Sequence, residues 1–207
     1  MPGKSDMKKA LMAALLLTTF TQAQTIFKEP WQTGMDGWTF AQQVCSGPSG
    51  PATCNSGLTT DGNPPDAIFY SVRTKGARGY GYFWKKLTWE QMGVPVGSTV
   101  TTITDAKIDG KAVGACSNNY SNSTVEVDVW DQYGNLCTGN DSVPATTIAK
   151  DTRWTTLQGF TNQPVKNANC SASSSVIMLG VLIGPNAKPS KTCEIRVDNL
   201  ELTIASQ

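Results

Sequence analysis

Residues 123–133 of the chain read STVEVDVWDQY, and this stretch decides the fold class. Valines fill every second position at its centre, and acidic or aromatic residues fill the positions between them. Successive side chains of a β-strand point to opposite faces, so the pattern predicts a strand with one core face and one outward face. The core face carries Val125, Val127 and Val129, and the outward face carries Glu126, Asp128 and Trp130.

The period of two recurs along most of the 207-residue chain, and clusters of Gly, Asn, Ser and Pro interrupt it at short intervals. This pattern predicts an all-β protein, namely a two-sheet antiparallel β-sandwich that is jelly-roll-like. Residues 176–183 are apolar on both faces, which favours a central strand in a covered sheet. The expected strands are 25–28, 38–44, 67–73, 78–85, 98–109, 123–133, 153–160, 174–183 and 193–204.

One short helix is expected between the strands. Thr88 can cap its start, Gln91 stands at the reciprocal position of a capping box, and Gly93 can end it before Pro95. Segments 47–62, 118–123 and 185–191 are polar and are expected to form long loops.

The N-terminal residues 1–23 have the features of a secretory signal peptide. Lys8 and Lys9 precede the apolar run 10–20, and the small residue Ala23 offers a cleavage site. A run of this length is too short to cross a bilayer as a helix. We therefore expect a secreted protein, extracellular or periplasmic, in which residues 24–207 form a single jelly-roll β-sandwich domain.

Charge and histidine content exclude several functional classes. The chain has 17 Lys and Arg against 16 Asp and Glu, and loss of residues 1–23 would leave a net charge of −1. Such a balance gives no bulk attraction to nucleic acid or to an anionic membrane. The chain contains no histidine, so catalytic schemes that need imidazole are excluded.

Six cysteines in an exported chain favour a disulfide framework. No pair has the Cys-x-x-Cys spacing of a zinc site, and no histidine can complete a mixed site. Fifteen pairings are possible from the sequence alone. Proximity along the chain favours Cys45 with Cys54, Cys116 with Cys137, and Cys170 with Cys193.

Two strands carry candidate ligand-binding residues. The outward face of 123–133 combines two carboxylates with an indole, which suits a sugar, because rings stack on its C–H faces and carboxylates accept from its hydroxyls. An ordinary solvated sheet face is the alternative. Residues 78–85 align further aromatic side chains on one side, as a binding platform or as core. These are Tyr80, Tyr82 and Trp84.

The last strand changes its alternation once. Ile195 and Val197 share one face, whereas the next apolar residues begin at Leu200, an odd step away. A β-bulge at Asp198 and Asn199 would restore the register.

The two ends of the chain resemble a known family. Phe27-Lys-Glu-Pro with the downstream Gly37-Trp-Thr-Phe, and the closing Arg196-Val-Asp-Asn-Leu, are similar to the first and last strands of carbohydrate-binding-module-like jelly rolls of the galactose-binding-like type. The resemblance implies that these two strands pair. It also implies a structural Ca²⁺ held by Glu29 and Asp198, since carboxylate oxygens suit this ion. The alternative is that Asp198 caps backbone amides at the bulge without metal.

An enzyme is the main alternative to a binding module. Residues 126–131 resemble the bulged Glu-x-Asp-x-x-Glu signature of retaining glucanases of the laminarinase-like type, with Asp131 in place of the last Glu. The resemblance implies Glu126 as nucleophile, Asp128 as an orienting residue and Asp131 as acid/base. A structural or adhesive extracellular protein is a third possibility.

The sequence thus favours a secreted, noncatalytic carbohydrate-binding or surface-recognition module. Its expected partner is a polysaccharide or a cell-surface glycan, with no nucleic acid and no membrane span. Exposure of the aromatic side chains separates these possibilities, because a solvent-facing row favours sugar binding and full burial favours a scaffold.

Overall fold

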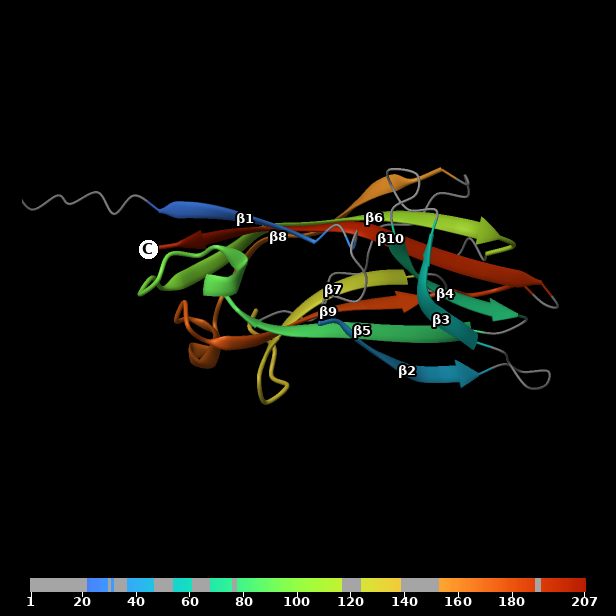
Figure 1. Cartoon of the computed structure of the whole chain (residues 1–207), viewed down its shortest axis with the longest axis horizontal. Coiled ribbons are helices and arrows are strands. Elements are labelled where there is room, and N and C mark those ends of the chain that lie inside the picture. Colours follow the sequence, from blue (N-terminus) through green and yellow to red (C-terminus); the bar gives the residue numbers. More distant parts are fainter. Residues whose placement is uncertain are drawn as a thin grey trace, which may run out of the picture.

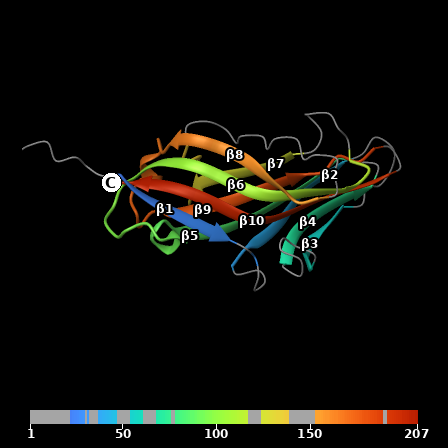
Figure 2. The same ribbon diagram turned by 90° about the horizontal axis from the view of Figure 1, so that it is seen from above.

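The computed structural model describes residues 22–29, 31, 37–46, 54–60, 68–75, 78–116, 124–138, 153–188 and 191–207. Figure 1 shows two layers of strands packed face to face. Figure 2 shows the molecule from above, with the layer that contains β1, β6, β8 and β10 toward the viewer. The all-β, two-sheet antiparallel sandwich predicted from the sequence is confirmed. Its strands are β1 (Ala23–Glu29), β2 (Thr39–Ser46), β3 (Cys54–Thr60), β4 (Ile68–Lys75), β5 (Arg78–Thr88), β6 (Val100–Gly114), β7 (Thr124–Asp131), β8 (Thr155–Pro164), β9 (Val176–Gly184) and β10 (Thr192–Ser206).

The long strand β10 organises the six-stranded sheet. Along one edge it pairs with β6, and β8 lies beyond β6. Along the other edge its first half pairs with β4 and its second half pairs with β1. The predicted pairing of the first and last strands is therefore confirmed. The predicted bulge is also present, because the register with β6 shifts after Asp198 and Asn199 adopts a φ of 50°.

The four-stranded sheet has the order β2-β5-β9-β7, and all its pairs are antiparallel. Strand β9 is an inner strand, as its apolar sequence predicted. Its inward residues pack against the inward residues of β10 to form the core, since both rows are fully buried. These residues are Ile177, Leu179, Val181 and Ile183 from β9, and Ile195, Val197, Leu200, Leu202 and Ile204 from β10.

Short 3₁₀ turns interrupt the strands. The expected helix is a single turn, η1 (Glu90–Met92), and a second turn is η2 (Ala168–Cys170). The predicted capping box is formed, because the Thr88 amide donates to the Gln91 side chain at 2.7 Å and the Gln91 amide donates to the Thr88 hydroxyl at 3.2 Å. Gly93 ends η1 in the left-handed region at a φ of 95°. Within the described residues, no helix is long and apolar enough to span a membrane.

One expected loop was wrong. Segment 47–62 contains β3, which pairs with β4 along its whole length. Strand β3 lies at the edge of its sheet, so backbone pairing on one side holds it. Its sequence, CNSGLTT, therefore lacks the alternation that identifies half-buried strands.

Two of the expected disulfides were also wrong. The described pairs are Cys116 with Cys193 and Cys137 with Cys170. Strand pairing brings Cys116 to Cys193 across 77 residues, because Gly114, just before Cys116, lies opposite Cys193. Proximity in the sequence was the wrong guide. The side chains of the remaining two cysteines lie outside the described residues, so their pairing stays a prediction.

Candidate functional site

Strands β5, β9 and β7 place side chains in three rows on the outward side of the four-stranded sheet. The residues between them, such as Phe83, Val181 and Val127, are buried in the core, so alternation directs these rows outward. We call this surface the outer face. Its rows are Tyr82, Leu182 and Glu126, then Trp84, Gly180 and Asp128, then Lys86, Met178 and Trp130.

The outer face unites the two candidate strands. The sequence assigned Tyr82 and Trp84 to one strand and Trp130 to another, and β9 holds these strands in one sheet. The rings of Tyr82 and Trp130 meet edge to face, with their centroids 5.3 Å apart. Along β5 from Tyr82, the ammonium of Lys86 lies over the ring of Trp84, 5.8 Å from its centroid.

The aromatic side chains of the outer face are neither core nor fully exposed. Tyr82, Trp84 and Trp130 are partly buried, and Phe83 fills the core in their place. The core alternative for Tyr82 and Trp84 is therefore wrong. The side chain of Tyr80, the third aromatic residue of that row, lies outside the described residues.

Asp128 and Tyr82 form the most enclosed polar part of the outer face. Asp128 is buried, with a relative exposure of 7%, whereas Glu126 is partly exposed. Burial raises the pKa of Tyr82 well above its usual value, and the negative charge of Asp128 raises it further. The Tyr82 hydroxyl therefore stays protonated at neutral pH and remains a hydrogen-bond donor.

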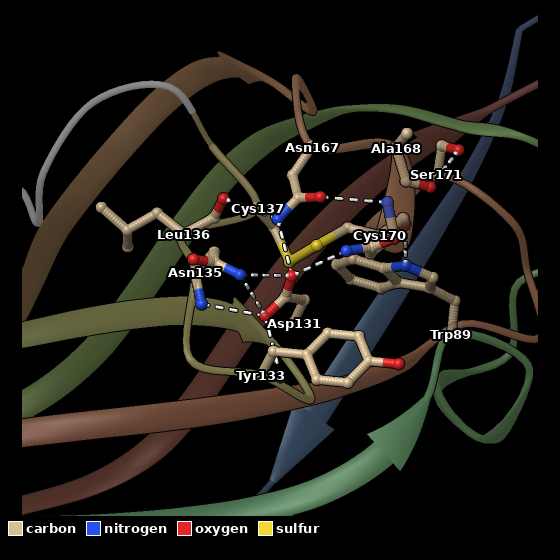
Figure 3. The surroundings of a disulfide bond; sticks show 11 residues. Trp89, Asp131, Tyr133, Asn135, Leu136, Cys137, Asn167, Ala168, Cys170 and Ser171 are labelled. Carbon is tan, nitrogen blue, oxygen red and sulfur yellow. Dashed lines mark hydrogen bonds between the residues drawn. A yellow bond between two sulfur atoms is a disulfide. The ribbon is translucent and has the colours of Figure 1, made fainter.

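Asp131 does not belong to the outer face. Strand β7 pairs with β9 without a register shift, so Asp131 points to the opposite side from Asp128. It is fully buried beside the disulfide between Cys137 and Cys170, as Figure 3 shows. The bulge of the glucanase signature is absent from this strand, and the three acids of that hypothesis are not brought together.

Five N–H donors surround the Asp131 carboxylate. Its Oδ1 accepts from the backbone amides of Tyr133 and Asn135, both at 2.9 Å. Its Oδ2 accepts from the side-chain amides of Asn135, Asn167 and Asn169 at 3.0–3.1 Å. Burial raises the pKa of Asp131, but the hydrogen bonds from Asn135, Asn169 and Asn167 outweigh burial and hold this pKa well below its usual value. A general acid needs the opposite shift, so Asp131 is a structural residue.

Glu29 and Asp198 do not fit a shared Ca²⁺ site. Glu29 lies opposite the core residue Leu200, whereas Asp198 follows the core residue Val197 and points to the other face of the sheet. Glu29 instead binds one ammonium and one indole N–H: its Oε2 accepts from Lys85 Nζ at 2.9 Å and from Trp38 Nε1 at 3.1 Å.

Asp198 accepts a backbone hydrogen bond within the β-bulge. Its Oδ1 accepts the backbone amide of Asn199 at 2.8 Å, which is the contact that the metal-free alternative required. The neighbouring Asn199 side chain donates to Asp109 on β6 at 2.9 Å. Across the described part of the chain, no cluster of three or more His, Cys, Asp or Glu residues could hold a metal ion.

Four outer-face residues were missed from the sequence: Gly180, Leu182, Lys86 and Met178. They become part of the site only through the cross-strand register, which a single sequence does not reveal. One signal was present, because an isolated glycine in an apolar strand marks a close approach of other groups.

No protein-family model matches the chain, and no curated protein matches it significantly. The structure is similar to the family 11 carbohydrate-binding module of the cellulosomal cellulase Lic26A-Cel5E of Clostridium thermocellum, with 15% identity, a TM-score of 0.43 and coverage of 87% of this chain and 95% of that chain. It is also similar to TmCBM61 in complex with β-1,4-galactotriose, with 11% identity, a TM-score of 0.41 and coverage of 84% and 97%.

Two further solved structures are similar. The K3 cleaved adhesin domain of Lys-gingipain from Porphyromonas gingivalis shows 14% identity, a TM-score of 0.42 and coverage of 87% and 98%. A carbohydrate-binding module of the β-sandwich superfamily shows 10% identity and a TM-score of 0.42, and the chain spans 56% of its length. The function proposed below rests on the residues of the outer face and not on these matches.

Proposed function

We propose that the protein is a secreted, noncatalytic module whose outer face binds a neutral polysaccharide. One observation carries the proposal. Tyr82, Trp84 and Trp130 lie on the outward side of a sheet that already has a complete core on its other side, and they remain partly exposed. Aromatic residues that are not needed for the core, and that stand beside carboxylates on one face, suit a ligand that is apolar on its ring faces and polar at its hydroxyls.

The polar groups around the rings supply both kinds of hydrogen-bond partner. Glu126 and Asp128 can accept from sugar hydroxyls, and the protonated hydroxyl of Tyr82 can donate. Residues of the same face on one strand are spaced by roughly 6.5–7 Å, and neighbouring strands by about 4.8 Å. All of these groups are therefore within reach of one oligosaccharide.

Stacking dominates the proposed affinity. Exchanging a hydroxyl's bonds to water for bonds to a carboxylate nets about 0.5–3 kcal/mol. An indole offers a rigid surface whose burial is worth roughly 25 cal/mol per Å², and it loses little conformational freedom on binding. Trp130 is thus the expected anchor.

The hydrolase alternative lacks its acid/base residue, Asp131, on the outer face. A retaining glycosidase needs two carboxyl groups that flank one bond, and Asp131 is buried on the other side of β7 from Glu126. A purely structural role does not account for the partly exposed aromatic rings of the outer face.

The experiment that tests the proposal is a glycan-array screen of the secreted protein, paired with a reducing-sugar assay on soluble β-glucans. We expect binding to one or more neutral polysaccharides without release of reducing ends. An array with no bound glycan contradicts the binding function, and sustained turnover that Glu126→Gln abolishes replaces it with the hydrolase.

A further inference from the structure

Gly180 lies at the centre of the outer face, in the middle row between Trp84 and Asp128. A Cβ atom at this position would lie 2.3 Å from the Tyr82 hydroxyl oxygen and 2.4 Å from Cζ3 of Trp130. Real Cβ contacts essentially never fall below 3.0 Å, so both rings occupy the space that any other side chain would fill.

The chain path does not require glycine here. The φ of Gly180 lies outside the left-handed region, in contrast to that of Gly93 or Gly134. Its neighbours in β9 have large side chains and adopt the same extended conformation. Glycine, moreover, weakens a strand interior. The requirement for glycine is therefore the space above its Cα atom.

That space lets two strands that are not neighbours share an aromatic contact. Tyr82 belongs to β5 and Trp130 to β7, and β9 lies between them. The rings belong to the first and third rows, so they reach each other diagonally across Gly180 and meet at a centroid distance of 5.3 Å. We call this pair of rings the aromatic ridge.

We infer that Gly180 is a positioning residue for ligand binding. Because it has no side chain, Tyr82 and Trp130 can meet above it and form a preformed ridge against which the sugar rings of the polysaccharide pack. The inference rests on the proposed function. A ridge that is assembled before the ligand arrives reduces the cost of ordering side chains on binding. It also separates Lys86, at one corner of the outer face, from Glu126 at the opposite corner, so the two flanks of the ligand meet unlike charges.

The first test measures the ridge without ligand. In NMR spectra of the whole protein, we expect nuclear Overhauser contacts between the indole of Trp130 and the ring of Tyr82. Gly180→Ala should abolish these contacts while the amide spectrum of the two sheets is retained. The matched control is Val176→Ala, which lies on the same strand and side but outside the three rows, and it should keep the contacts. Absence of the contacts in the wild type, or their persistence in Gly180→Ala, would overturn the inference.

A mutant cycle measured by melting temperature covers the case in which Gly180→Ala folds poorly. In the wild-type background the substitution should lower the melting temperature. In a Tyr82→Ala/Trp130→Ala background the same substitution should leave the melting temperature unchanged or raise it, because the space is then empty. Equal losses in both backgrounds would show that the strand itself needs glycine and would overturn the inference.

The second test measures binding of soluble mixed-linkage β-glucan and of the array-positive glycans by calorimetry. Gly180→Ala should weaken binding about tenfold or more, and Val176→Ala should not. Binding unchanged in Gly180→Ala despite a lost ridge contact would overturn the positioning role. A wild type that binds no glycan contradicts the proposed function instead, and the ligand-free tests still decide whether Gly180 positions the rings.

Discussion

Asp128 and Asp131 lie three residues apart on β7 and point to opposite sides of the four-stranded sheet. Asp128 belongs to the outer face beside Tyr82, whereas Asp131 is buried at the end of the sandwich among five N–H donors. One strand thus separates the proposed ligand-binding role of Asp128 from the structural role of Asp131, and substitutions at the two positions should have different effects.

Asp131→Asn should lower the melting temperature, because an amide in place of the carboxylate leaves some of the surrounding N–H donors without an acceptor. It should leave glycan affinity unchanged in the folded protein. Glu126→Gln is the matched control, since it changes the same charge on a partly exposed residue and should hardly affect stability. Differential scanning calorimetry of both variants checks this. Equal melting temperatures for Asp131→Asn and the wild type would contradict the structural role.

Asp131 also predicts a pH dependence. Its pKa is lowered on folding, so its stabilising contribution is complete above its unfolded value near 3.8 and is lost as the pH falls from there toward the lower folded value. The wild type should therefore lose more stability below about pH 4 than Asp131→Asn does. Denaturant titrations at a series of pH values measure the difference. Parallel acid profiles in the two proteins would contradict the assignment.

The ion pair of Glu29 with Lys85 joins β1 to β5 across the sandwich. Glu29→Gln should destabilise the protein by roughly 1–3 kcal/mol, because it leaves the partly buried ammonium without its charged partner. Any change in melting temperature on addition of millimolar Ca²⁺ should be the same in the wild type and in this variant. A Ca²⁺ stabilisation that is lost in Glu29→Gln would restore the metal site that the contacts of Glu29 argue against.

The disulfides should be Cys116 with Cys193 and Cys137 with Cys170, with Cys45 and Cys54 forming the third pair and no free thiol in the mature protein. Nonreducing peptide mapping by mass spectrometry checks this. Replacing the Cys137–Cys170 pair by serines should cost roughly 4 kcal/mol, since the closed loop spans 33 residues. Linked peptides from Cys116 and Cys137 would contradict the described connectivity.

Much of the fold was predictable because it depends on local periodicity. The valine alternation of 123–133 identified β7 and both of its faces, and the odd step after Val197 identified the bulge of β10. The capping box at Thr88 was readable from four residues. Strand β3 was not predictable in this way, because an edge strand held by backbone pairing needs no apolar face.

The site was predictable only in pieces. Glu126, Asp128 and Trp130 follow from one strand, and Tyr82 and Trp84 from another, but their union on one face depends on β9 lying between them. The role of Gly180 depends on that same register. The predicted disulfide pairing was wrong for a related reason, since the pairing of β10 with β6 brings Cys193 to Cys116, which is far from it in the sequence.

The most direct test of the central claim compares the glycan affinities of Trp130→Ala and Tyr133→Ala by isothermal titration calorimetry on the purified protein. Tyr133 is the matched control, an aromatic residue that is 73% exposed on the turn after β7 and lies outside the outer face. We expect Trp130→Ala to weaken binding of the array-positive polysaccharide at least tenfold and more than Glu126→Gln does, with the fold retained and Tyr133→Ala unchanged. Unchanged affinity in Trp130→Ala would contradict the assignment of the outer face as the binding site.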